Sequence, residues 1–196
     1  RLETEEMKRR LLDINPRCSV TTICDFVTSE NVDDLLDHTL LPLNTTVIID
    51  AIDNKNEKTA LIAASANRSI PIVTCGGAAG RIDPTRIVCD DITKAQEDRL
   101  LFWTRKALRQ KHGYPKGVGK GVTNTHRVKK WNISSVYSTE VQRSVVNVDA
   151  SSLRRCDGAL GTACHVTGTY GFVAAARVVE MIANDDLLIP VPPRTV

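Results

Sequence analysis

The sequence has few aromatic residues, no paired CxxC motif and no glycine fingerprint for a nucleotide. Phe, Trp and Tyr make up 4% of its 196 residues. Ala, Val and Ile supply most apolar positions, which favours α/β layers over an all-β sandwich. The 6 cysteines are scattered, so no zinc site of the paired type is expected. Neither GxGxxG nor GxxxxGK occurs, which excludes the usual phosphate loops from this stretch of sequence.

Acidic residues are absent from one long window. Between Arg99 and Thr139 there is no Asp or Glu, although the net charge of the chain is only +3. Clustered Lys and Arg neutralise phosphates, so the window predicts a polyanionic partner. A basic surface that is simply solvated is the alternative. The candidate residues are Arg105, Arg109, Lys116, Lys120, Lys129 and Lys130, with Arg154 and Arg155 in a second basic turn.

The sequence also lacks the marks of export and membrane insertion. No charged leader followed by a short apolar core opens it, so we expect reduced thiols and a cytoplasmic location. The longest apolar stretch, 159–183, contains His165, Arg177 and Glu180. Charged residues at these positions fit a core helix better than a membrane span, so no transmembrane segment is predicted.

Periodicity and turn residues predict alternating helices and strands. The expected helices are 1–16, 29–38, 54–67 and a basic helix from 93 or 98 to about 110; the expected strands are 18–26, 47–49, 71–75, 85–90 and 131–138. This alternation predicts an α/β fold with a Rossmann-like, mostly parallel sheet and flanking helices. The expected segments are 1–98 in the core, 99–130 as a basic helix and mobile loop, 131–186 with a long core helix, and a Pro-rich tail, 187–196.

The chain is organised around the strand at 47–49, which ends in carboxylates. Val47, Ile48 and Ile49 form a continuous β-branched run, typical of a strand that helices cover on both faces. Asp50 and Asp53 follow it, and a helical pattern begins after Asn54. Ligands of open α/β sheets bind beyond the carboxyl ends of the strands, so this turn is a candidate ligand site. Helix capping by Asp53 or Asn54 explains the same residues.

A glycine-rich loop follows the next predicted strand. The stretch 71–75 runs into Gly76-Gly77-Ala78-Ala79-Gly80. At the carboxyl end of a strand, such a loop lets a ligand approach the backbone closely. A flexible turn before Arg81 is the plainer interpretation.

Four blocks of sequence, in order along nearly the whole chain, carry a family resemblance. They are VIIDAID (47–53) with KTALIA (58–63), PIVTCGGAAGRIDPT (71–85), VYSTE (136–140), and CDGALG (156–161) with TGTYGFVA (167–174). These blocks closely resemble tRNA threonylcarbamoyladenosine dehydratases, a branch of the ubiquitin-activating-enzyme-like superfamily.

The resemblance implies a reaction, a site and partners. The reaction is the ATP-dependent dehydration of threonylcarbamoyladenosine in tRNA to a cyclic form, through an adenylated carboxylate. Asp53 would be a catalytic residue that holds magnesium with ATP, which suits a hard oxygen-seeking cation. Cys156 would be a second catalytic residue, although a small residue in a tight turn explains it equally. The resemblance further implies ATP contacts from Asp50, Ala51, Ile52, Asp53, Asn54 and Lys58, and a substrate loop of Gly76, Gly77, Gly80 and Arg81. The basic window would bind tRNA.

One departure from the family keeps other functions open. The family's Gly-rich nucleotide loop and the first βαβ portion of its fold lie upstream of where this chain begins. We therefore expect residues 1–196 alone to bind ATP poorly. The alternatives are adenylation of the C-terminus of a ubiquitin-like or sulfur-carrier protein, and a non-catalytic RNA-binding fragment. Members of the superfamily are commonly homodimers, and some eukaryotic relatives associate with mitochondria.

Overall fold

A four-stranded sheet forms the centre of the computed structural model, which describes residues 2–39, 46–115, 129–141 and 161–192. The strands are β1 (Ile48–Asp50), β2 (Ile72–Cys75), β3 (Ile87–Asp91) and β4 (Ser134–Ser138). Their order is β1-β2-β4-β3, with β1, β2 and β4 parallel and β3 antiparallel to β4. The predicted α/β class with a mostly parallel sheet is confirmed.

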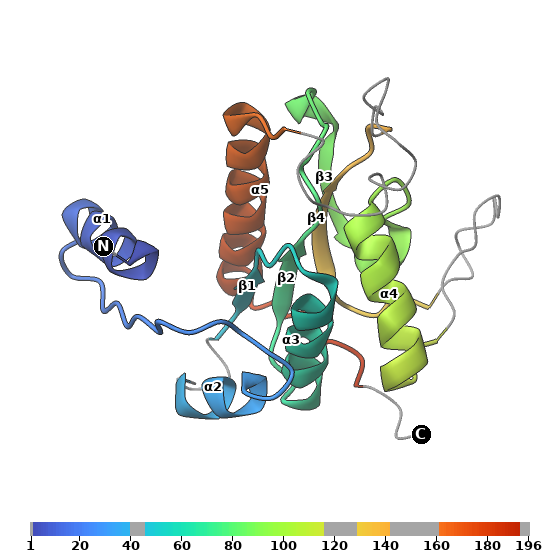
Figure 1. Ribbon diagram of the computed structural model, residues 1–196, viewed down its shortest axis with the longest axis horizontal. Coiled ribbons are helices and arrows are strands. Elements are labelled where there is room, and N and C mark those ends of the chain that lie inside the picture. Colours follow the sequence, from blue (N-terminus) through green and yellow to red (C-terminus); the bar gives the residue numbers. More distant parts are fainter. Residues whose placement is uncertain (1, 40–45, 116–128, 142–160, 193–196) are drawn as a thin grey trace.

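Helices cover both faces of this sheet (Figure 1). Helices α3 (Lys55–Asn67) and α4 (Arg99–His112) lie on one face, and α5 (Cys164–Ala183) lies on the other. Helix α2 (Val32–Thr39) packs beside α3, while α1 (Glu3–Ile14) lies apart from the sheet. Short 3-10 turns at Pro84–Arg86 and Ile92–Lys94 flank β3.

Two apolar clusters follow from the alternation of side chains along the strands. Ile72 belongs to the cluster shared with α3 and α4, and its neighbour Val73 belongs to the cluster shared with α5. Trp131 is fully buried in the first cluster, where its ring lies 4.7 Å from that of Tyr114. The middle of the sheet is therefore covered on both sides. In the described sheet, however, β1 is an edge strand and Ile49 is 50% exposed, so the prediction that helices cover this strand on both faces is wrong.

Polar caps set where the two site-facing helices begin. Asn54 Oδ1 accepts a hydrogen bond from the backbone N–H of Asn56 at 2.9 Å, which caps α3. Asp98 caps α4, so of the two predicted starting points the second is correct. Helix α4 ends at Gly113, whose φ of 62° is left-handed and suits a residue without a side chain.

The predicted strand over 18–26 is wrong, because the structure assigns no regular element to these residues. A strand requires a neighbour for its backbone N–H and C=O groups. Among the described residues, none pairs with this segment, since the sheet consists of β1 to β4 alone.

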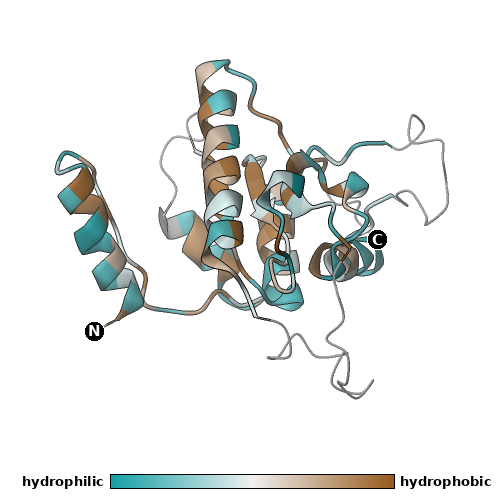
Figure 2. Cartoon of the chain, turned by 90° about the horizontal axis from the view of Figure 1, so that it is seen from above, coloured by the Kyte–Doolittle hydropathy of each residue, from teal (hydrophilic) through white to brown (hydrophobic). Residues whose placement is uncertain are grey.

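Two helices keep apolar side chains exposed. No residue of α1 is buried, and its apolar side chains face solvent, with Met7 55% and Ile14 82% exposed. Figure 2 shows the same helix standing apart from the rest of the chain. Helix α5 buries Val166, Tyr170, Ala174 and Met181 against the sheet. Within the described residues it is the one helix whose length and composition would also allow a membrane crossing, which by itself is weak evidence for one.

Candidate active site

The carboxyl ends of the three parallel strands meet at one edge of the sheet. The register pairs Asp50 with Thr74, and Cys75 with Val136. The turn after β1 and the glycine loop after β2 therefore start side by side. In an open α/β sheet this edge is where ligands bind.

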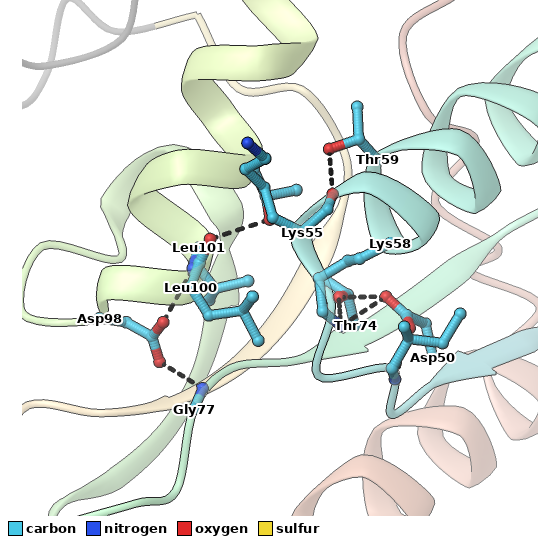
Figure 3. Close-up of polar contacts among 11 residues, drawn as sticks. Asp50, Lys55, Lys58, Thr59, Thr74, Gly77, Asp98, Leu100 and Leu101 are labelled. Carbon is cyan, nitrogen blue, oxygen red and sulfur yellow. Dashed lines mark hydrogen bonds and ion pairs between the residues drawn. The ribbon is translucent and has the colours of Figure 1, made fainter. Parts of the chain in front are cut away.

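A buried ion pair fixes the end of β1 (Figure 3). Lys58 Nζ donates to Asp50 Oδ2 at 2.7 Å and to Thr74 Oγ1 at 3.1 Å, and Thr74 Oγ1 donates to the same carboxylate oxygen at 2.6 Å. Asp50 Oδ1 accepts from the N–H of Ile52 at 2.9 Å. Both charged groups are buried and pair with each other, and the contact of Asp50 and Lys58 with ATP stays a prediction. They position the turn.

The turn itself presents Asp53 to solvent. Asn54 caps α3, so of the two residues that could cap the helix it is Asn54 that does. Asp53 is exposed, as are Ala51 and Asn54, while Ile52 is partly buried. No hydrogen bond or ion pair to the Asp53 carboxylate occurs within the described part of the chain. The arrangement leaves one carboxylate available at the N-terminal end of α3.

Two side chains from distant elements hold the glycine loop. Asp98 Oδ2 accepts from the N–H of Gly77 at 2.9 Å, while its Oδ1 accepts from the N–H of Leu101 at 2.8 Å (Figure 3). On the other side, the Tyr170 hydroxyl donates to Gly77 O at 3.3 Å and accepts from the N–H of Ser138 at 2.9 Å. Burial raises the pKa of both Asp98 and Tyr170. The loop is therefore held by α4 on one face of the sheet and by α5 on the other.

Close contacts and backbone geometry explain two of the glycines. A Cβ on Gly76 would lie 2.1 Å from Asp98 Oδ2, so no side chain fits there. Gly80 has a φ of 70°, which side chains with a Cβ rarely adopt. The loop is thus a shaped turn with specific anchors.

Arg81 follows the loop and is 3% exposed. Its Nη2 donates to Glu97 O, whereas Nε and Nη1 are buried and have no hydrogen-bond partner within the described residues. The next two backbone N–H groups, of Ile82 and Asp83, donate to Glu140 Oε2 at 3.0 and 3.1 Å. A buried guanidinium with unused N–H groups is suited to an anionic oxygen.

The basic residues predicted to bind RNA divide into exposed and buried members. Lys129 and Lys130 are exposed, and Arg109 is half-buried on α4. Arg105 is different: it is 8% exposed, and its Nη1 donates to the backbone carbonyls of Ile92 and Ala95. Burial lowers the pKa of Arg105 to about 10. In this structure the Arg105 guanidinium ties α4 to the turn after β3, and its contact with RNA stays a prediction.

Several predicted site residues lie outside the described residues. They are Cys156, Lys116, Lys120, Arg154 and Arg155. Of the described cysteines, Cys18, Cys24 and Cys164 are exposed, and burial raises the pKa of the Cys75 and Cys89 thiols.

Sequence reasoning missed the anchors of the glycine loop. Asp98 was expected only as a helix cap, and nothing in the local sequence links it to Gly77, 21 residues away. Tyr170 stands 93 residues from Gly77, in the 167–174 block, and no local pattern links the two. Contacts of this kind depend on the packing of α4 and α5 against the sheet. The one local signal is the glycine at position 76, which the close approach of Asp98 explains.

The sheet, with the acidic turn and the anchored glycine loop at its carboxyl edge, defines an α/β protein with a Rossmann-like, mostly parallel sheet. The chain belongs to the ThiF family, whose family model matches residues 3–189. It is 33% identical over 185 residues to a tRNA threonylcarbamoyladenosine dehydratase of Haemophilus influenzae, covering 93% of this chain and 66% of that protein.

Solved structures give the same relationship. The chain is similar to the Escherichia coli tRNA N6-threonylcarbamoyladenosine dehydratase in complex with AMP, with a TM-score of 0.74 and 35% identity over 93% of this chain and 65% of that one. For the same enzyme in complex with ATP the TM-score is 0.72, with 35% identity over 93% of this chain and 64% of that one. The chain thus spans just under two thirds of the length of these relatives.

Proposed function

We propose that the chain is part of an ATP-dependent tRNA threonylcarbamoyladenosine dehydratase. The observation that carries the proposal is the meeting, at one sheet edge, of the Asp53 turn and the anchored glycine loop. The relatives with this fold are named for that activity and were solved with AMP and ATP. In the reaction the substrate carboxylate attacks the α-phosphorus of ATP and releases pyrophosphate. A nucleophile of the same modified nucleoside then displaces AMP and closes the ring.

Asp53 is the residue we assign to magnesium. Its exposed carboxylate fits the group, because protein-bound Mg²⁺ takes one or two carboxylates and fills its other positions with phosphate oxygens and water. Within the described residues no group of three or more His, Cys, Asp or Glu side chains could form a metal site from protein alone. When bound, the cation would neutralise phosphate charge. Asp50 and Lys58 would keep the turn that carries Asp53 in place.

Arg81 and the glycine loop are assigned to the substrate. Arg81 Nε and Nη1, which have no hydrogen-bond partner within the described residues, can donate to the two oxygens of a carboxylate, and the residues of the glycine loop are partly exposed. In this role Arg81 orients the threonyl carboxylate. The exposed Lys129 and Lys130 and the half-buried Arg109 would contact the phosphates of tRNA, as would Lys116, Lys120, Arg154 and Arg155.

The test uses the full-length protein with tRNA that carries threonylcarbamoyladenosine, ATP and Mg²⁺, followed by mass spectrometry of the nucleosides. We expect loss of one water from the modified adenosine. Asp53→Asn should abolish it without loss of folding, since the side chain is exposed. Glu30→Gln, at another exposed acidic residue, is the matched control. Undiminished dehydration by Asp53→Asn would remove the magnesium role, and no dehydration by the unsubstituted protein would refute the function.

A second copy of the chain is the partner we propose for α5. Phe172, Val179 and Ile182 are 80%, 64% and 54% exposed along the solvent side of this helix. Exposed apolar stripes of this kind mark interaction surfaces. Sedimentation of the unsubstituted protein should give a dimer, and Phe172→Glu should give a monomer. A monomer for both would contradict the homodimer.

A further inference from the structure

The solvent face of α4 combines aromatic and cationic side chains in one stripe. Arg99, Phe102, Trp103 and Lys106 follow at helical spacing, and Phe102 and Trp103 are each 42% exposed. Large aromatic side chains are unusual on an open helix face, and these are among few aromatics in the chain. We therefore take these two exposed side chains as a candidate binding surface.

The two rings are held in a defined arrangement. Their centroids are 5.2 Å apart and their planes are inclined at 81°. Lys106 Nζ lies 4.9 Å from the centroid of the Trp103 ring, a cation–π contact. A groove of about 500 Å³ opens beside the rings and is lined further by Gln96, Glu97, Asp98 and Val141. This volume is within the range of small-ligand pockets, about 300 to 1,000 Å³.

The groove adjoins the glycine loop. Asp98 lines the groove and holds Gly77, and the Glu97 carbonyl accepts from Arg81. A molecule seated between Phe102, Trp103 and Glu97 would thus lie next to whatever the loop binds. The Asp98 carboxylate is already occupied by two backbone N–H groups, so Gln96 and Glu97 are the side chains that offer hydrogen bonds.

We propose that this groove stacks an unpaired base of the RNA strand that carries the modified adenosine. The inference rests on the proposed function. Aromatic faces with neighbouring cations are the usual platform for unpaired bases, whose phosphates the cations neutralise. The positive charge of α4 suits a nucleic acid, since Arg99, Lys106 and Arg109 lie on its outer side. Gln96 and Glu97 can form hydrogen bonds with the amino and ring nitrogen groups at the edge of a base.

The experiment measures binding of single-stranded RNA to the full-length protein by fluorescence anisotropy over a series of salt concentrations. Trp103→Ala should weaken binding about 5- to 150-fold, the range for loss of one stacked base. The salt dependence should keep its slope, because no phosphate contact is lost, whereas Lys106→Ala should flatten it. Phe26→Ala, at an 88% exposed aromatic residue outside the groove, is the matched control and should bind normally.

A second readout uses the two tryptophans of the chain. Trp131 is 0% exposed and Trp103 is 42% exposed, so RNA should quench Trp103 alone. Trp103→Phe keeps an aromatic face and should retain most of the affinity while losing the quenching. Equal RNA binding by the unsubstituted protein and Trp103→Ala would overturn the proposal and leave the proposed function standing. Absence of RNA binding by the unsubstituted protein would overturn this proposal, whereas the proposed function is decided by the dehydration assay; tighter binding of a peptide than of RNA would replace RNA as the occupant.

Discussion

Removal of the Lys58 ammonium is the sharpest test of how the site is held together. Lys58 and Thr74 are 0% exposed and Asp50 is 1% exposed, and the closest Nζ to Oδ2 distance is 2.7 Å. At this distance and an effective dielectric constant of about 20, Coulomb's law gives an attraction of about 6 kcal/mol. Desolvation offsets much of it, so the pair itself adds little. Lys58→Met, however, leaves a buried carboxylate without its partner, and we expect a loss of about 3–5 kcal/mol.

Urea unfolding followed by circular dichroism measures this loss. Asp50→Asn combined with Lys58→Met should recover much of it, because the neutral amide can still accept from Ile52 and donate to Thr74. Lys55→Met, at an exposed lysine of the same helix, should change stability by no more than about 0.5 kcal/mol. If Lys58→Met cost less than about 1 kcal/mol, the buried ion pair would not be what positions the turn.

Three further outcomes follow from the loop and its anchors. Gly76→Ala should destabilise by about 1–3 kcal/mol through its clash with Asp98, whereas Gly77→Ala, whose Cβ would meet nothing closer than 3.9 Å, should be tolerated in urea unfolding. Burial raises the pKa of Asp98 above its ordinary 3.8, so near this pH the native state binds more protons than the unfolded state. The free energy of unfolding should therefore fall as the pH rises from about 3.8 through the raised pKa. Asp98→Asn should remove this pH dependence when urea unfolding is measured at a series of pH values. Iodoacetamide at pH 8 should label Cys18 and Cys24 faster than Cys75 and Cys89, whose raised pKa leaves less thiolate, and equal labelling by mass spectrometry would contradict their burial.

Local sequence could predict the elements of the site but not their contacts. The β-branched run, the Asn54 cap and the glycine loop are encoded within a few residues, and the structure has β1, α3 and β2 where they were expected. Burial cannot be deduced in this way. Lys58 and Arg105 look like ligand-binding cations in the sequence, yet both are buried, since only the packing of α3 and α4 on the sheet decides which way they point. The 18–26 segment shows the same limit, because strand residues form a strand only where a neighbour pairs with them.

Asp98 links the two halves of the proposed site through one carboxylate. Oδ1 accepts from the N–H of Leu101 and caps α4, the helix that carries Phe102 and Trp103. Oδ2 accepts from the N–H of Gly77 and holds the glycine loop. A movement of α4 by about one ångström would therefore break the hydrogen bond between Gly77 and Asp98 or move the loop together with the helix, because Asp98 is already packed closely against Gly76. A base stacked on α4 and a substrate carboxylate at Arg81 would then be held at a fixed separation. Such positioning converts binding of the surrounding RNA strand into orientation of the reacting group.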